Sequence, residues 1–148
     1  MKQDEIRQAV EEDLFDCSIL RHGFTPYMRD YELVVRSLDE RERTFRFTHC
    51  VVASVTTAVG DAVWKESWDD RFIDYGAWEN SGEPEGHVWG VCWFCAYPGA
   101  TYMTDSVLAQ EWSQRLGKTM HEVQIETNGH NLRLVFHDLK VSESSVSS

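Results

Sequence analysis

Apolar and polar residues alternate along much of this chain with the period of β-strands. The alternation predicts two strands that form a hairpin, over residues 15–24 and 29–38. A long third strand is predicted over residues 44–57, because Phe45, Phe47 and the odd-numbered residues after them share one face. Three consecutive two-faced strands are typical of an antiparallel meander with one face toward the core.

The most apolar stretch of the chain is residues 87–97, which turn-forming residues bound on both sides. It is rich in aromatic and β-branched residues, and it does not alternate. Such a composition is typical of a strand that is buried on both faces. We therefore expect residues 87–97 to lie in the middle of a sheet.

The last predicted element is a β-hairpin around Asn128-Gly129, the dipeptide that two-residue hairpin turns prefer. Pairing Thr127 with His130 across this turn places apolar residues opposite one another. The expected cross-strand pairs are Ile125 with Leu132, Val123 with Leu134, and His121 with Phe136. A slip of one residue would bury polar side chains instead, so the register is well specified.

Three segments have the period of helices. Residues 2–14 combine one apolar face with an acidic remainder, and are predicted to be a helix that flanks the domain. Residues 61–68 are predicted to be a short helix with Asp61 as its N-cap. Residues 105–116 begin with N-cap chemistry and stop before Gly117. The face of this last helix that is expected to be buried consists of Leu108, Trp112 and Leu116.

Together these elements predict a single α+β domain over residues 1–141. Its core is expected to be one twisted, mainly antiparallel sheet of about six or seven strands, on which the helix at 105–116 packs. Residues 142–148 contain little apolar material and are predicted to be a disordered, serine-rich tail. No segment has the pattern of a signal peptide or a membrane-spanning helix, which favours a cytoplasmic protein.

The chain is acidic, with 14 basic and 25 acidic residues and a net charge of −11. This charge disfavours binding to nucleic acid or to an anionic membrane, and it favours basic partners. The alternative is that it serves solubility alone. Eight acidic and only two basic residues lie between Gly60 and Gly86, together with three of the six tryptophans.

Aromatic residues surrounded by charges of one sign suit the capture of a cationic surface. We therefore expect the segment 60–86 to bind a basic protein partner. The alternative is that its tryptophans cover the sheet while its acids face water. The residues predicted to contact the partner are Asp69, Asp70, Asp74, Trp78 and Glu79.

The sequence contains no recognisable catalytic motif, so a non-enzymatic role is favoured. Cys92 and Cys95 have C-x-x-C spacing, but they lie inside the predicted strand 87–97, where their side chains point to opposite faces. They are interpreted as structural thiols, and neither a metal nor a cofactor is expected. His121-Glu122 lacks the second histidine of a zinc-protease motif.

A second hypothesis is a small-molecule site, or an enzyme site, assembled from polar residues at strand ends. Its candidate residues are His22, Arg29, Asp30 and His121. Cys17, His22 and His49 would also converge if the first and third predicted strands were paired.

Several short segments of the chain match those of a known family, and their order and spacing are more specific together than any one segment is alone. They are residues 22–32, 45–50, 63–67, 88–93, 97–99, 121–130 and 134–136. With them the chain resembles the YxiG-like family of bacterial proteins, over about residues 16–141. The resemblance implies no particular activity and carries over no catalytic residue. Small acidic bacterial proteins of this kind are often considered as immunity or antitoxin proteins, and that association fits an inhibitor of a basic toxin or enzyme.

Overall fold

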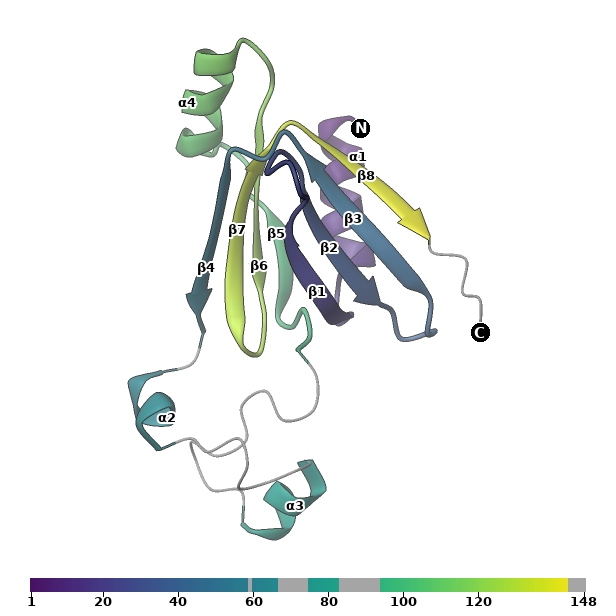
Figure 1. Cartoon of the computed structure of the whole chain (residues 1–148), viewed down its shortest axis with the longest axis vertical. Helices are drawn as coiled ribbons and strands as arrows, with labels where there is room; N and C mark the ends of the chain where they lie inside the picture. Colours follow the sequence, from purple (N-terminus) through teal and green to yellow (C-terminus); the bar gives the residue numbers. More distant parts are fainter. Residues whose placement is uncertain (59, 67–74, 83–93, 144–148) are drawn as a thin grey trace.

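The structure, a computed structural model, describes residues 1–58, 60–66, 75–82 and 94–143. In this part of the chain eight strands form two antiparallel sheets of four strands each (Figure 1). The first sheet has the order β1 (Ser18–Phe24), β2 (Tyr31–Arg36), β3 (Glu42–Thr48), β8 (Asp138–Glu143). The second has the order β4 (Val52–Thr57), β7 (His130–Phe136), β6 (His121–Glu126), β5 (Gly99–Tyr102). The predicted α+β class is confirmed, but the prediction of a single sheet is wrong.

The two sheets share one bent β-ribbon, which explains the difference. The predicted strand 44–57 is divided into β3 and β4, and β7 is followed directly by β8. Thr48 pairs with Asp138, and Val52 pairs with Val135. Three residues on one strand therefore lie opposite two on the other, which is the count of a β-bulge and bends the ribbon. We call the segment 49–51 with its neighbour His137 the bend.

The core lies between the inner faces of the two sheets. Phe45 and Phe47 of β3 are fully buried, as are Leu134 and Phe136 of β7. The rings of Phe47 and Phe136 are 4.8 Å apart and nearly perpendicular, so one aromatic pair joins the two sheets next to the bend.

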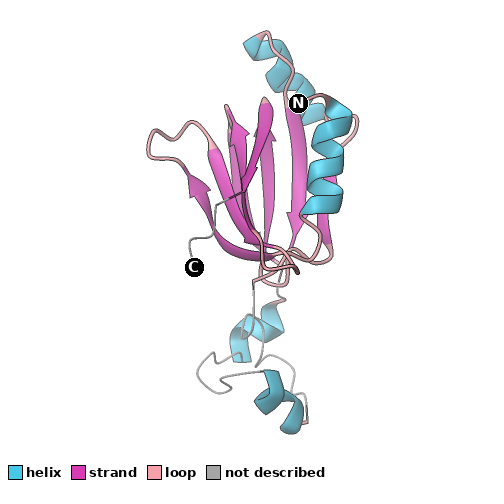
Figure 2. Cartoon of the chain, turned by 90° about the vertical axis from the view of Figure 1, so that its right-hand side faces the viewer, coloured by secondary structure: helices cyan, strands magenta, loops and turns pink. Residues whose placement is uncertain are grey.

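The chain begins with α1 (Gln3–Gln8), which continues as the π-helical turn η1 (Ala9–Asp13). Ile6, Val10 and Leu14 are fully buried, while most of the acidic residues are exposed. Figure 2 shows this helical segment, beside the mark N, lying along the strands. The apolar face is the predicted one, and it contributes directly to the core.

The hairpin of β6 and β7 has the predicted register. His121 pairs with Phe136, Val123 with Leu134, and Ile125 with Leu132. Turn chemistry and hydrophobic alternation both require this register, so the sequence determines it twice over.

The ends of helix α4 (Val107–Leu116) are also confirmed. The Ser106 side chain accepts a hydrogen bond from the backbone N–H of Ala109, and Gly117 adopts φ 66° after the last turn. The predicted buried face is wrong, because α4 lies at the end of the second sheet rather than across it (Figure 1). Ala109 is the buried residue, Leu108 and Trp112 are half-buried, and Leu116 is 42% exposed.

Most of the apolar stretch 87–97 lies outside the described residues. Its described end, residues 94–97, runs beside the start of β1, where Cys95 forms an isolated bridge with Ser18. The backbone N–H of Ile19 donates to the carbonyl of Phe94. This end of the stretch therefore lies at the edge strand of the first sheet.

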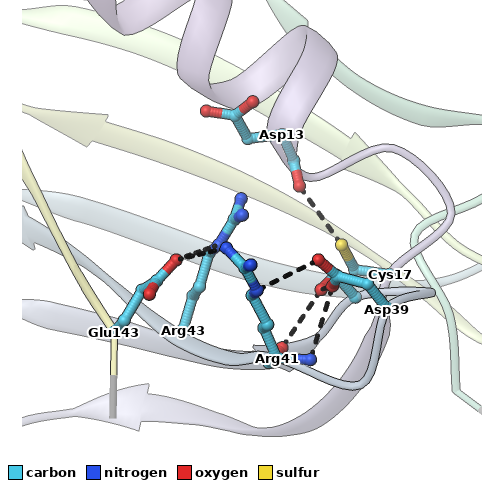
Figure 3. A network of polar contacts seen from close by, with 7 residues as sticks. Asp13, Cys17, Asp39, Arg41, Arg43 and Glu143 are labelled. Atoms are coloured by element: carbon cyan, nitrogen blue, oxygen red, sulfur yellow. Dashed lines mark hydrogen bonds and ion pairs between the residues drawn. The ribbon is translucent and has the colours of Figure 1, made fainter. Parts of the chain in front are cut away.

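Strand β8 is not predicted by the sequence, although it completes the first sheet. Ser142 and Glu143, assigned above to the tail, pair with Thr44 and Arg43 of β3. Arg43 and Arg41 both contact the Glu143 carboxylate, at 3.4 and 3.8 Å (Figure 3). Residues 144–148 lie outside the described residues.

Candidate functional site

The acidic segment is only partly described. Asp69, Asp70 and Asp74 lie outside the described residues, as does the side chain of Trp78. Two short helices are described, α2 (Asp61–Glu66) and α3 (Tyr75–Asn80), and Glu79 in α3 is exposed. Figure 1 places both helices beyond the end of the sheets where the β6–β7 hairpin turns.

Trp64 connects α2 to the body of the protein. Its indole N–H donates to the Thr57 hydroxyl at 2.9 Å, and its ring meets that of His130 edge-on at 6.2 Å. The side chain is nevertheless 45% exposed. An aromatic ring that is both held and exposed is the kind of residue that anchors protein interfaces.

A second group of polar residues gathers at the bend, at the opposite end of the sheets. The loop before β2 is hydrogen-bonded to the bend: the backbone N–H of His49 donates to an Asp30 carboxylate oxygen at 3.0 Å. The backbone N–H of Cys50 also donates to the Arg29 carbonyl at 2.9 Å. Two residues predicted as parts of a small-molecule site, Arg29 and Asp30, are thus brought beside His49.

Side chains from three parts of the chain meet at the His49 imidazole. The Arg29 Nη2 lies 2.6 Å from Nε2 of the ring, and the Lys118 Nζ lies 3.0 Å from Nδ1. The ring of His137 stacks on that of His49 at 5.8 Å and 17°. We call Arg29, His49, Lys118 and His137 the bend cluster.

The charges around His49 favour its neutral form. Burial lowers the pKa of His49, and the nearby charges of Lys118 and Arg29 lower the pKa further. Asp30 acts in the opposite direction, more weakly. At neutral pH the ring is therefore an uncharged imidazole between two cations.

The bend cluster lies between two hollows that share Arg29 and His49. One has a volume of about 390 Å³ and is also lined by Met28, Val51, Leu116 and Lys118. The other has a volume of about 370 Å³ and is more polar, with Asp30, His137 and Lys140 in its wall. Each has room for one small organic molecule.

His22 and His121, the other two residues of the small-molecule hypothesis, lie elsewhere. The Nδ1 of His22 is 2.6 Å from the Tyr31 hydroxyl, and the Nδ1 of His121 is 2.6 Å from the Tyr102 hydroxyl. Burial lowers the pKa of both histidines. β2 separates β1 from β3, so Cys17, His22 and His49 do not converge through strand pairing.

Lys118 and His137 are not among the site residues predicted from the sequence. Lys118 follows the glycine that ends α4, and His137 stands between β7 and β8. Neither belongs to a motif; His137 comes to His49 where the ribbon bends, and Lys118 comes to it from the connection between α4 and β6. Their one available signal was their position directly after the end of a predicted element.

A family model described as YxiG-like protein matches residues 2–148. The chain belongs to the YxiG-like protein family. The match includes the N-terminal helix and the tail, which lie outside the sequence resemblance. No curated protein matches this YxiG-like chain. In the described part of the chain, no helix has the length and apolar character to cross a membrane.

Among the described residues of the YxiG-like protein, one carboxylate is strongly buried: Glu122 of β6, which is 2% exposed. Arg133 Nε donates to it at 2.5 Å, and Ser106 and Gln124 donate as well. Burial alone would raise the pKa of Glu122, but these hydrogen bonds outweigh burial and hold the pKa below its usual range. This arrangement joins the start of α4 to the second sheet, and we assign it a structural role.

The described cysteines of the YxiG-like protein are free thiols: Cys17 and Cys50 are buried and Cys95 is half-buried. Burial raises the pKa of Cys50 to about 12, and burial raises the pKa of Cys17 and Cys95 as well. Cys92 lies outside the described residues. Within those residues, no group of three or more His, Cys, Asp or Glu side chains is arranged to hold a metal ion.

Proposed function

We propose that this YxiG-like protein is a non-enzymatic binding protein that holds a basic protein partner through the segment 60–86. An inhibitor of the immunity or antitoxin kind is the form of this function that fits a small acidic protein of this class. The observation that carries the proposal is Trp64, an exposed tryptophan held at the surface within the most acidic segment of the chain.

The described residues of this segment support an interface at the hairpin end of the sheets. Asp61 and Glu79 are exposed on α2 and α3. Trp64 is fixed by Thr57, so its ring loses little conformational freedom when a partner covers it. A fixed aromatic anchor with exposed acids around it suits a cationic surface.

Charge supports the same interface. The segment has a net charge of −6 within a protein of −11. Attraction from such a segment would speed the encounter with a basic partner and make the association rate sensitive to salt. The Debye length falls from about 10 Å at 0.1 M salt to about 3 Å at 1 M salt, so the effect is measurable.

The experiment isolates the partner from the native host by affinity capture and then measures binding kinetics by surface plasmon resonance. The triple variant Asp69→Asn, Asp70→Asn, Asp74→Asn should slow association, and Trp64→Ala should mainly speed dissociation. A matched control, Asp4→Asn, Glu12→Gln, Asp13→Asn, removes the same charge from exposed positions of the N-terminal helical segment. An association rate that is insensitive to salt, or that both triple variants lower equally, would refute the proposal.

A further inference from the structure

The bend cluster brings two cations together, and within the described residues no carboxylate forms an ion pair with either of them. Arg29 and Lys118 both contact His49, yet neither forms an ion pair with any described Asp or Glu side chain. Two carboxylates lie nearby, and both are engaged elsewhere: Asp30 accepts from the backbone N–H of His49, and Asp138 pairs with the N-terminal ammonium of Met1 at 2.6 Å. In a chain with 25 acidic residues, this arrangement is not a consequence of a shortage of acids.

Three other arginines of the chain, Arg41, Arg43 and Arg46, show the contrast. Arg41 and Arg43 contact Asp39 and Glu143, as Figure 3 shows, and Arg46 contacts Glu32 at 2.6 Å. In those places each guanidinium has a carboxylate from the protein itself. At the bend cluster two cations instead share one uncharged ring.

The hydrogen-bonding capacity of His49 makes the shortage of acceptors explicit. A guanidinium and an ammonium can only donate, and a neutral imidazole accepts at one nitrogen and carries a hydrogen on the other. Whichever nitrogen of His49 carries the hydrogen, one of the two cations faces an N–H group. The cluster therefore has more donors than acceptors, and an anion would supply the acceptors that are missing.

The hollow of about 390 Å³ has a cationic wall, formed by the bend cluster, and an apolar wall beside it. Met28 and Leu116, which are 67% and 42% exposed, line it together with Val51. Arg29, His49 and Lys118 line it as well. A ligand that fills it would place an acidic group on the cations and an apolar body on the side chains of Met28 and Leu116.

The backbone also supports a binding role. His49 has φ 47° and Met28 has φ 57°, in the left-handed region that glycine and asparagine normally occupy. Each such conformation is unfavourable for a residue with a Cβ atom. Both strained residues line the same hollow, and strain of this kind concentrates at ligand sites.

We infer that the hollow at the bend cluster binds a small organic anion, a phosphate monoester or a carboxylate that carries an apolar body. Arg29 and Lys118 hold the acidic group, and Met28, Val51 and Leu116 cover the apolar part. The site lies at the opposite end of the sheets from α2 and α3, and so it is separate from the proposed protein interface (Figure 1).

The first test is a titration of the full chain with phenyl phosphate at low ionic strength, followed by NMR. Shift changes should centre on Met28, His49 and Lys118. Inorganic phosphate lacks the apolar body and benzyl alcohol lacks the charge, so each should bind at least about fivefold more weakly. Equal affinity for all three compounds, or no shift change at millimolar phenyl phosphate, would overturn the inference.

Variants then locate the site. Arg29→Gln and Lys118→Gln should each weaken phenyl phosphate binding about tenfold, because each removes a charge-assisted hydrogen bond. Arg21→Gln removes the same charge from an exposed position on β1 and should leave binding unchanged. A thermal unfolding scan verifies that each variant is folded. An equal loss in Arg21→Gln would show general charge attraction and refute a site at the bend.

A lipid headgroup could present the same phosphate chemistry, and a separate experiment distinguishes the two sources. The protein should not co-sediment with phosphatidylcholine vesicles that contain phosphatidic acid, because the protein's net charge of −11 opposes its approach to an anionic surface. Sedimentation with these vesicles, combined with no response to phenyl phosphate, would contradict the small-molecule assignment.

Discussion

Replacement of Arg133 by methionine should destabilise the protein through the buried carboxylate of Glu122. The methionine keeps most of the apolar stem and removes the guanidinium, which donates to Glu122 at 2.5 and 3.3 Å. Breaking a fully buried ion pair costs about 3–5 kcal/mol. The Arg133 side chain is 46% exposed, so solvent already screens part of the interaction. We expect the free energy of unfolding to fall by about 1–2 kcal/mol.

Urea unfolding at pH 7 measures this change, and two more variants, Glu122→Leu alone and Glu122→Leu combined with Arg133→Met, separate the charge pair from packing. Glu122→Leu, combined with Arg133→Met, removes both partners and should cost less than Arg133→Met alone, because no unpaired carboxylate is left buried. The double-mutant cycle should therefore give a coupling energy of about 1–2 kcal/mol. A cost below about 0.5 kcal/mol for Arg133→Met, or strict additivity, would refute the assigned role.

The pH dependence has a defined sign. The pKa of Glu122 is lower in the folded protein than in the unfolded chain, so its stabilising contribution is complete above the unfolded value of about 4.3. That contribution is lost as the pH falls through the lower, folded value. In Arg133→Met the main hydrogen bond that lowers the pKa is gone, so the difference in unfolding free energy between this variant and the wild type should shrink as the pH falls from neutral toward the folded pKa of Glu122.

Three further predictions concern the core and the thiols. Phe47→Ala should lower the free energy of unfolding by about 3–5 kcal/mol, whereas Leu38→Ala, at a side chain that is 82% exposed, should change it by less than about 0.5 kcal/mol in the same urea titration. Trp112→Ala should lower the free energy of unfolding clearly less than Phe47→Ala, because Trp112 is half-buried under the Arg115 guanidinium. An equal decrease would show that α4 packs across the sheet. Cys50 should resist iodoacetamide at pH 8 in the folded protein and react after unfolding, because burial raises its pKa to about 12; mass spectrometry of the labelled peptide decides this.

Elements whose signals are local could be predicted from the sequence. The register of the β6–β7 hairpin follows from Asn128-Gly129 and the alternation on either side of it. The ends of α4 follow from Ser106 and Gly117. In both cases the residues that determine the structure lie within a few positions of the element that they define.

The arrangement of the sheets could not be predicted in this way. Residues 44–57 alternate except at the apolar run of residues 50–53, and such a run also occurs within continuous buried strands, so it does not by itself mark the division into β3 and β4. The extra residue is apparent only against the partner strand, where β7 and β8 supply two residues opposite three. The prediction of the buried face of α4 was wrong for a similar reason. The helical period of residues 105–116 predicts which residues form an apolar stripe, but it does not predict that α4 lies at the end of the sheet.

The candidate site was predicted only in part. Arg29 and Asp30 were selected as polar residues near a strand end, and the structure brings them to His49. Lys118 and His137 complete the cluster through contacts across 69 residues of chain and across the bend. Such contacts depend on tertiary structure, and the sequence pattern around either residue carries no trace of them.

The bent ribbon also determines when the anion site can exist during folding. The β6–β7 hairpin and the meander of β1, β2 and β3 rest on contacts between neighbouring segments, but Thr48 and Asp138 are 90 residues apart. Pairing over such a distance pays a large loop-closure entropy and tends to be slow. During synthesis β3 must therefore wait for β8 to leave the ribosome. Only then can His137 stack on His49, so anion binding at the bend would report that the last long-range step of folding is complete.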